Sequence, residues 1–119
     1  MKRLVRSFLA VEAATFGAAS LVHTGRLVTG YEHGKAAIAE GVIGAVLLAA
    51  LIASIVAPRV SRAVGIGAQA FALLGTLVGI TTMAIGVGPQ TGADVALHVC
   101  LVIMLVTGIV LARRASPRA

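Results

Sequence analysis

Four long apolar runs make up most of the sequence, and short polar segments separate them. A helix needs about 20 consecutive apolar residues to cross the hydrocarbon core of a bilayer. Runs of this kind fall at about 5–27, 36–57, 64–85 and 94–112. They lack the alternation of apolar and polar residues that is typical of strands, and open sheet edges are not tolerated in hydrocarbon. The pattern therefore predicts four transmembrane helices.

The segments between the runs indicate how the helices connect. Pro58 ends the second run, and Gly86, Gly88 and Pro89 form a turn after the third, because proline interrupts a helix and glycine favours turns. Short links of this kind leave consecutive helices packed side by side in alternating directions. The predicted fold is an all-α, integral membrane four-helix antiparallel bundle that forms a single domain over residues 1–119.

Composition supports a membrane location. The chain is 59% hydrophobic and only 12% charged, with a mean hydropathy of +1.04. Soluble domains are about 45–50% apolar. We therefore expect the helices to pack against one another in lipid rather than in water.

Basic residues are distributed unevenly between the two ends of the predicted helices. Eight of the ten lie before the first run, between the second and third, or after the fourth: Lys2, Arg3, Arg6, Arg59, Arg62, Arg113, Arg114 and Arg118. The other two connections, at about 24–35 and 86–93, hold only Arg26 and Lys35. Basic loops stay in the cytoplasm, so both termini are expected there, in the inner (plasma) membrane. The net charge of +6 thus indicates topology and contact with anionic lipid headgroups, and no nucleic-acid partner is expected.

Small residues recur at helical spacing in two of the runs. The second run carries one at every fourth position: Ala37, Gly41, Ala45, Ala49 and Ala53. Gly75 and Gly79 make a GxxxG step in the third. Such stripes let helix backbones approach closely in lipid. They indicate either packing inside the bundle or a face for a homo-oligomer or larger membrane complex, and spacing alone does not separate these alternatives.

Three ionisable residues are predicted to lie at one depth near the outer ends of three helices. His23 and Glu40 each lie about four residues inside the outer end of a helix, and His98 follows Asp94 by four residues. At about 1.5 Å per residue, all three lie roughly 6 Å below the surface. Two imidazoles and a carboxylate are a common ligand set for a divalent metal such as zinc or non-haem iron. The sequence therefore predicts His23, Glu40 and His98 as metal ligands, and a haem between the first and fourth helices is also compatible.

Neighbouring polar residues extend this candidate ligand-binding site. Asp94 lies one turn from His98, where its carboxylate is expected to orient the imidazole. Glu32 and His33 lie in the adjacent outer connection and are expected to close over the site. The alternative is that these are interfacial side chains that reach toward water, with Glu40 paired to one of the two outer basic residues.

Glu12 is a carboxylate in the middle of the first predicted helix, roughly 10 Å from the inner surface. A charge at that depth is costly unless it is protonated or paired. Gln69, at similar depth on the third helix, is its expected neutral partner, and Arg6 is a second candidate. Glu12 and His23 are close to three whole turns apart, so both project from about the same face. Glu12 is therefore either a buried structural acid or the exchangeable acid of a proton path.

Three stretches of the chain carry a resemblance to a known group. The segment HTGRLVTGYEHGKAAIAEGVIG, followed by AQAFALLGTLVGI and GVGPQT, resembles an uncharacterised family of short four-span bacterial membrane proteins, many from actinobacteria. The residues that carry this resemblance are His23, Glu32, His33, Glu40, Pro89, Asp94 and His98. The second predicted helix is also similar to that of DoxX-like four-span proteins. These resemblances imply the four-span fold and no specific activity.

Two functions from different classes remain open. The first is an accessory membrane protein whose outer cluster binds a metal, a haem or a small lipophilic ligand. The second is a small proton-coupled transporter with Glu12 as the exchangeable acid; small multidrug resistance proteins share the size, the four spans and a glutamate in the first helix. The chain lacks the aromatic residues of those transporters. No redox motif such as CxxC occurs, and an enzyme is not expected.

Overall fold

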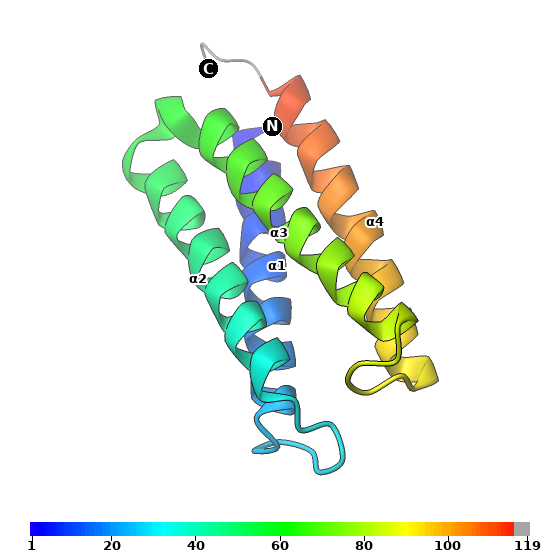
Figure 1. Ribbon diagram of the computed structural model, residues 1–119. Coiled ribbons are helices and arrows are strands. Elements are labelled where there is room, and N and C mark those ends of the chain that lie inside the picture. Colours follow the sequence, from blue (N-terminus) through cyan, green and yellow to red (C-terminus); the bar gives the residue numbers. More distant parts are fainter. Residues whose placement is uncertain (116–119) are drawn as a thin grey trace.

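A computed structural model gives the fold, and it describes residues 1–115 of the 119-residue chain. The described residues form four long helices and one short 3-10 turn, with no strand among them (Figure 1). In chain order the elements are α1 (Lys2–His23), α2 (Gly34–Val56), η1 (Pro58–Val60), α3 (Ser61–Ala84) and α4 (Gly92–Arg114). The prediction of an all-helical fold is confirmed.

The four long helices are long and apolar enough to cross a membrane, with η1 and α3 forming one stretch (Pro58–Ala84). Large apolar side chains cover the outside of the helices, and Ile38, Val56 and Ile85 are 71%, 78% and 72% exposed. Soluble monomers rarely expose contiguous apolar surface of this extent. The chain is therefore a multi-pass membrane protein, as its apolar runs predict.

The helix ends differ from the predicted ones by a few residues because local capping sets them. The helix α1 ends at His23, about four residues earlier than expected, since Gly25 has a φ of +74° and left-handed backbone ends a helix. At the start of α4, the Thr91 hydroxyl accepts from the Asp94 backbone N–H at 3.3 Å. The Asp94 carboxylate accepts from the Thr91 backbone N–H at 3.0 Å. This reciprocal capping box starts α4 at Gly92, two residues before the predicted start.

The ends of the bundle carry different parts of the chain. The connections 24–33 and 85–91 lie at one end, whereas η1, the start of α1 and the end of α4 lie at the other (Figure 1). The two connections predicted to be poor in basic residues therefore share an end. The basic residues around η1 and the termini of the helices gather at the opposite end.

Small residues bring the backbones of α1 and α2 close together. A Cβ added at Gly44 would lie 3.5 Å from the Ala13 carbonyl oxygen, and one added at Gly41 would lie 3.3 Å from Ser20 Oγ. Ser20 Oγ also donates to the Ala37 carbonyl at 2.7 Å, which ties the two helices together. Gly41, a member of the predicted stripe, and Gly44, which lies outside that stripe, thus serve packing between α1 and α2, whereas Ala45 and Ala49 of the stripe are exposed. A homo-oligomer face stays a prediction.

The GxxxG step of α3 receives side chains from both neighbouring helices. A Cβ added at Gly75 would lie 2.5 Å from Ile43 Cδ1 of α2, and one added at Gly79 would lie 3.0 Å from His98 Nε2 of α4. Neither glycine leaves room for a larger residue without movement of its neighbour. The step therefore admits one apolar and one polar side chain into the bundle.

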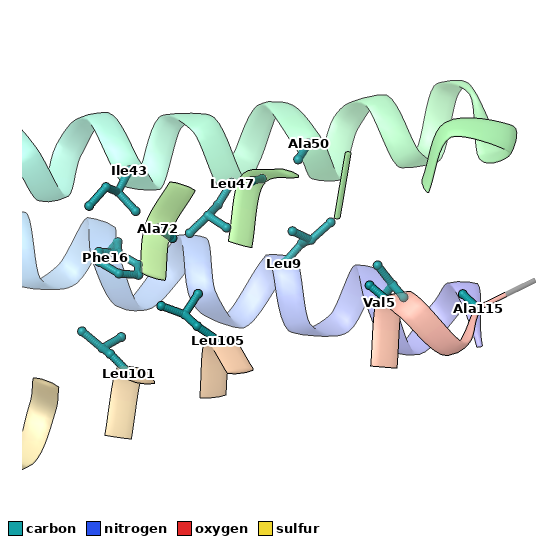
Figure 2. Close-up of a cluster of buried hydrophobic side chains, with 12 residues drawn as sticks. Val5, Leu9, Phe16, Ile43, Leu47, Ala50, Ala72, Leu101, Leu105 and Ala115 are labelled. Carbon is teal, nitrogen blue, oxygen red and sulfur yellow. The ribbon is translucent and has the colours of Figure 1, made fainter. Parts of the chain in front are cut away.

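A continuous apolar core runs along the middle of the bundle (Figure 2). Its largest buried members come from three helices: Val5, Leu9 and Phe16 of α1, Ile43 and Leu47 of α2, and Leu101 and Leu105 of α4. The small Ala68 and Ala72 of α3 fill the remaining space. Phe16, Ile43 and Leu101 lie together at one end of this core (Figure 2).

Candidate functional site

A cavity of about 380 Å³ opens between the helices at the end that carries the connections 24–33 and 85–91. All four long helices and both connections contribute to its wall. Its polar lining residues are His23, His33, Lys35, Glu40, Thr76, Thr82, Asp94 and His98. Phe16, Ile43 and Leu101 line it from the apolar core. The cavity therefore combines polar residues toward the two connections with an apolar floor toward the middle of the bundle.

His23 and Glu40 form a buried pair in the cavity wall. His23 Nδ1 lies 2.6 Å from Glu40 Oε2, and the two residues are only 5% and 8% exposed. The pair joins the last residue of α1 to the second turn of α2, a contact strengthened by the low polarity around it. Glu40 is thus paired with His23, and not with an outer basic residue as the alternative interpretation of the sequence proposed.

His33 covers the cavity from the first connection. Its Nδ1 accepts a hydrogen bond from the Ala36 backbone N–H at 3.2 Å, which caps the start of α2. The ring meets that of His23 edge to face, with centroids 6.4 Å apart. It also packs on Gly88 of the second connection, where a Cβ would overlap the imidazole. The glycine, at a φ of +80°, thus gives His33 the space to link the two connections.

His98 lines the cavity from α4, with one ring nitrogen bonded to its own helix. Its Nδ1 lies 2.8 Å from the Asp94 backbone oxygen, and since a carbonyl only accepts, Nδ1 carries the hydrogen. In the neutral ring, Nε2 is then an acceptor, and it packs against Gly79 of α3, one of the residues that line the cavity. The sequence assigned the orientation of His98 to the Asp94 carboxylate. The structure gives it to the backbone carbonyl, because the carboxylate is used by Thr91 in the capping box.

Glu32 lies outside the cavity. Its Oε2 accepts from the Gly30 backbone N–H at 2.8 Å, and the side chain packs on Gly25 in the same connection. Lys35 lines the cavity, although the sequence did not single it out as a site residue. Its position directly before the second apolar run, at the predicted outer end, was the signal in the sequence that could have identified it.

Threonines of α3 also line the cavity, and the sequence did not single them out. Thr76 Oγ1 donates to the Ala72 carbonyl at 2.9 Å, and Thr82 Oγ1 donates to the Gly79 carbonyl at 2.7 Å. Both hydroxyl hydrogens are therefore used within α3. Each oxygen keeps acceptor capacity toward the cavity.

The predicted metal ligands line one cavity without forming a metal-binding group. His23 and Glu40 bond to each other, whereas His98 is held on α4 by its own backbone contact. Within residues 1–115, no three His, Cys, Asp or Glu side chains come together in a way that could hold a metal ion. Haem binding stays a prediction.

Glu12 lies nearer the middle of the bundle than the cavity and takes no part in the cavity lining. It is 0% exposed, and Phe16, one turn above it on α1, forms part of the cavity floor. Arg6, the second predicted partner of Glu12, instead donates to the Ser54 carbonyl at 2.5 Å. The acid is therefore enclosed in the bundle and separated from the cavity by an aromatic ring.

Comparison with known proteins does not assign this chain to a family. A scan of protein-family models and searches of curated proteins and of solved structures found no match. The resemblances to actinobacterial and DoxX-like four-span proteins thus stay predictions. The chain is a four-helix, multi-pass membrane protein with a cavity lined in part by polar residues at one end of the bundle.

Proposed function

We propose that this protein binds a small amphiphilic ligand in the cavity at the end of the bundle. One observation carries the proposal: a single cavity joins three histidines and two carboxylates to an apolar floor. Binding sites for small molecules are mostly apolar concavities of about 300–1,000 Å³ with a few convergent polar groups. A volume of about 380 Å³ suits a compact molecule with one ring or a short chain.

The hydrogen-bonding pattern indicates the chemistry of the ligand head. His98 Nε2 offers an acceptor, because Nδ1 of the same ring donates to the Asp94 carbonyl. His33 offers a donor, because its Nδ1 accepts from Ala36 and leaves the hydrogen of a neutral ring on Nε2. A head that both donates and accepts, such as a hydroxyl, a phenol or an amide, satisfies both histidines. The ligand body would then lie on the floor formed by Phe16 and Leu101.

Charge distribution supports an orientation for this site in the membrane. Arg59 and Arg62 lie at the η1 end of the bundle, and most other basic residues flank the start of α1 and the end of α4. Basic segments remain in the cytoplasm. We place both termini there, with the helices antiparallel and the basic end on anionic headgroups. The cavity then opens at the outer face, where lipophilic molecules can enter from the outer leaflet.

Mass spectrometry of small molecules that co-purify with the protein tests ligand binding. The parent would be compared with His98→Leu, which removes the acceptor from the cavity, and with Cys100→Leu. Cys100 is exposed two residues further along the same helix, so Cys100→Leu is a matched control at similar depth. We expect an amphiphile that is enriched in the parent and in Cys100→Leu and is at least tenfold depleted in His98→Leu. Equal amounts of every extracted molecule in all three preparations would contradict the proposal.

A further inference from the structure

A carboxyl group and an amide meet in the middle of the bundle, where α1, α3 and α4 pack together. Glu12 and Gln69 are both 0% exposed. A Cβ added at Gly108 of α4 would overlap the Gln69 side-chain oxygen and would lie 2.9 Å from Glu12 Oε1. The two oxygens therefore occupy the space that any side chain at position 108 would need. The absence of a side chain on Gly108 is what lets them approach each other.

The orientation of the Gln69 amide follows from its other contact. Gln69 Nε2 donates to the Gly65 carbonyl at 3.0 Å. Exchanging the amide oxygen and nitrogen would set an acceptor against that carbonyl, so Oε1 is the atom that faces Gly108 and Glu12. Neither Gln69 Oε1 nor either carboxyl oxygen of Glu12 has a hydrogen-bond partner. Three buried oxygens thus lack a donor at one place.

No basic side chain among the described residues is placed to pair with Glu12. On α1, Arg6 lies six residues before Glu12, roughly 9 Å along the helix, and forms no ion pair with it; its guanidinium donates to the Ser54 carbonyl, while its Nε has no partner. Arg62 of α3 lies seven residues before Gln69, roughly 10 Å along the helix. The other ionisable residues of the helices packed around Glu12 lie toward the helix ends or on the outside: Lys35 and Glu40 of α2, and Asp94, His98, Cys100, Arg113 and Arg114 of α4. An ionised Glu12 would be an uncompensated charge that faces a second acceptor.

We propose that Glu12 is a proton-binding site: its carboxyl group is protonated in the folded bundle and donates its O–H to Gln69 Oε1 beside Gly108. One proton, taken from water by the carboxylate, forms the O–H bond and supplies the donor that Gln69 Oε1 lacks. A proton fits where a metal ion does not, because calcium and magnesium require about six or more oxygen ligands. The site is separate from the outer cavity, whose floor at Phe16 lies one turn above it.

The proton bound at this site would hold α1 against α3. Gln69 is fixed by its bond to Gly65 on its own helix, so an O–H from Glu12 joins the two helices through a stationary acceptor. Loss of the proton would leave a carboxylate beside an amide oxygen, and the resulting repulsion would separate them. The carboxyl group is thus expected to remain neutral for as long as the helices stay packed.

Infrared spectroscopy of the full chain in lipid bilayers at neutral pH tests the assignment. The difference spectrum between the parent and Glu12→Gln should contain the carbonyl band of one protonated carboxylic acid. In Gln69→Leu the band should persist and move to higher frequency, because the acid loses its acceptor. A difference spectrum with only carboxylate bands would overturn the proton site, and a band unmoved in Gln69→Leu would overturn Gln69 as the acceptor.

A measurement on the unaltered chain keeps the test independent of how well the variants fold. The sequence has three glutamates, of which Glu32 is exposed and serves as an internal reference for an ionised side chain. In solid-state NMR of protein with ¹³C-labelled glutamate, one carboxyl carbon should stay at the protonated position at neutral pH. Observation of all three carboxyl carbons at the ionised position of Glu32 would contradict the proposal.

Discussion

The His23–Glu40 pair allows a quantitative test of the cavity wall through a double-mutant cycle. Replacing either residue by alanine leaves the other without its partner at a place where His23 is 5% and Glu40 8% exposed. Replacing both removes the two polar groups together. The cycle compares the free energies of unfolding of the parent, His23→Ala, Glu40→Ala and the double variant.

The expected magnitude follows from the geometry of the pair. Hydrogen bonds between transmembrane helices average about 0.6 kcal/mol in double-mutant cycles. The 2.6 Å distance between His23 Nδ1 and Glu40 Oε2 and the burial of both residues indicate a stronger contact. Removing one partner of a buried pair costs about 3 kcal/mol, largely because the remaining group is unsatisfied. We therefore expect each single variant to lose about 3 kcal/mol and the double variant little more, which gives a coupling energy of about 2 kcal/mol or above.

Unfolding would be followed by circular dichroism as the protein is transferred from mild detergent to dodecyl sulfate. Glu32→Ala is the matched control, because Glu32 is an exposed carboxylate that bonds only within its own connection. We expect that variant to stay within about 0.5 kcal/mol of the parent. Single losses that add up in the double variant, with a coupling energy near zero, would refute the reasoning.

Three further changes test other parts of the structure. His33→Ala removes the cap on α2 and the cover over Gly88, and should cost about 1 kcal/mol and release a bound ligand faster, as measured by unfolding and by dissociation kinetics. Gly108→Ala puts a methyl group onto the Gln69 oxygen and should lower stability by about 1–3 kcal/mol, whereas Gly67→Ala, with open space around it, should be neutral or stabilising in the same assay. A reporter fused after Ala119 should be active only if it is a cytoplasmic reporter, and activity of a periplasmic reporter there would exclude the proposed topology.

The fold was predictable from the sequence because lipid imposes a simple rule on it. Each span needs about 20 apolar residues, and proline or glycine marks each turn, so four helices follow from four runs. The exact ends of the helices depended on single residues. The capping box of Thr91 and Asp94 extends α4, and the left-handed backbone conformation of Gly25 shortens α1. Neither effect can be inferred from the length of an apolar run.

The depth of the candidate site was easier to predict than its contacts. Counting residues from the helix ends put His23, Glu40 and His98 near one level, and all three line one cavity. Which atoms meet depends on how each helix is rotated about its axis. A helix that is apolar on all sides gives little pattern from which to infer that rotation. The sequence therefore could not show that Glu40 bonds to His23, or that Asp94 caps its own helix.

Binding of a defined amphiphile in the cavity is the most direct test of the proposed function. The probe would be 4-butylphenol, a ring with one hydroxyl and a short chain, titrated into the parent in lipid nanodiscs and followed by NMR of the histidine rings, Phe16 and Leu48. We predict saturable shifts at His98, His33 and Phe16, with none at Leu48 on the lipid-facing side of α2. Shifts that rise without saturation, and that are as large at Leu48 as at His98, would show partition into lipid and would contradict ligand binding in the cavity.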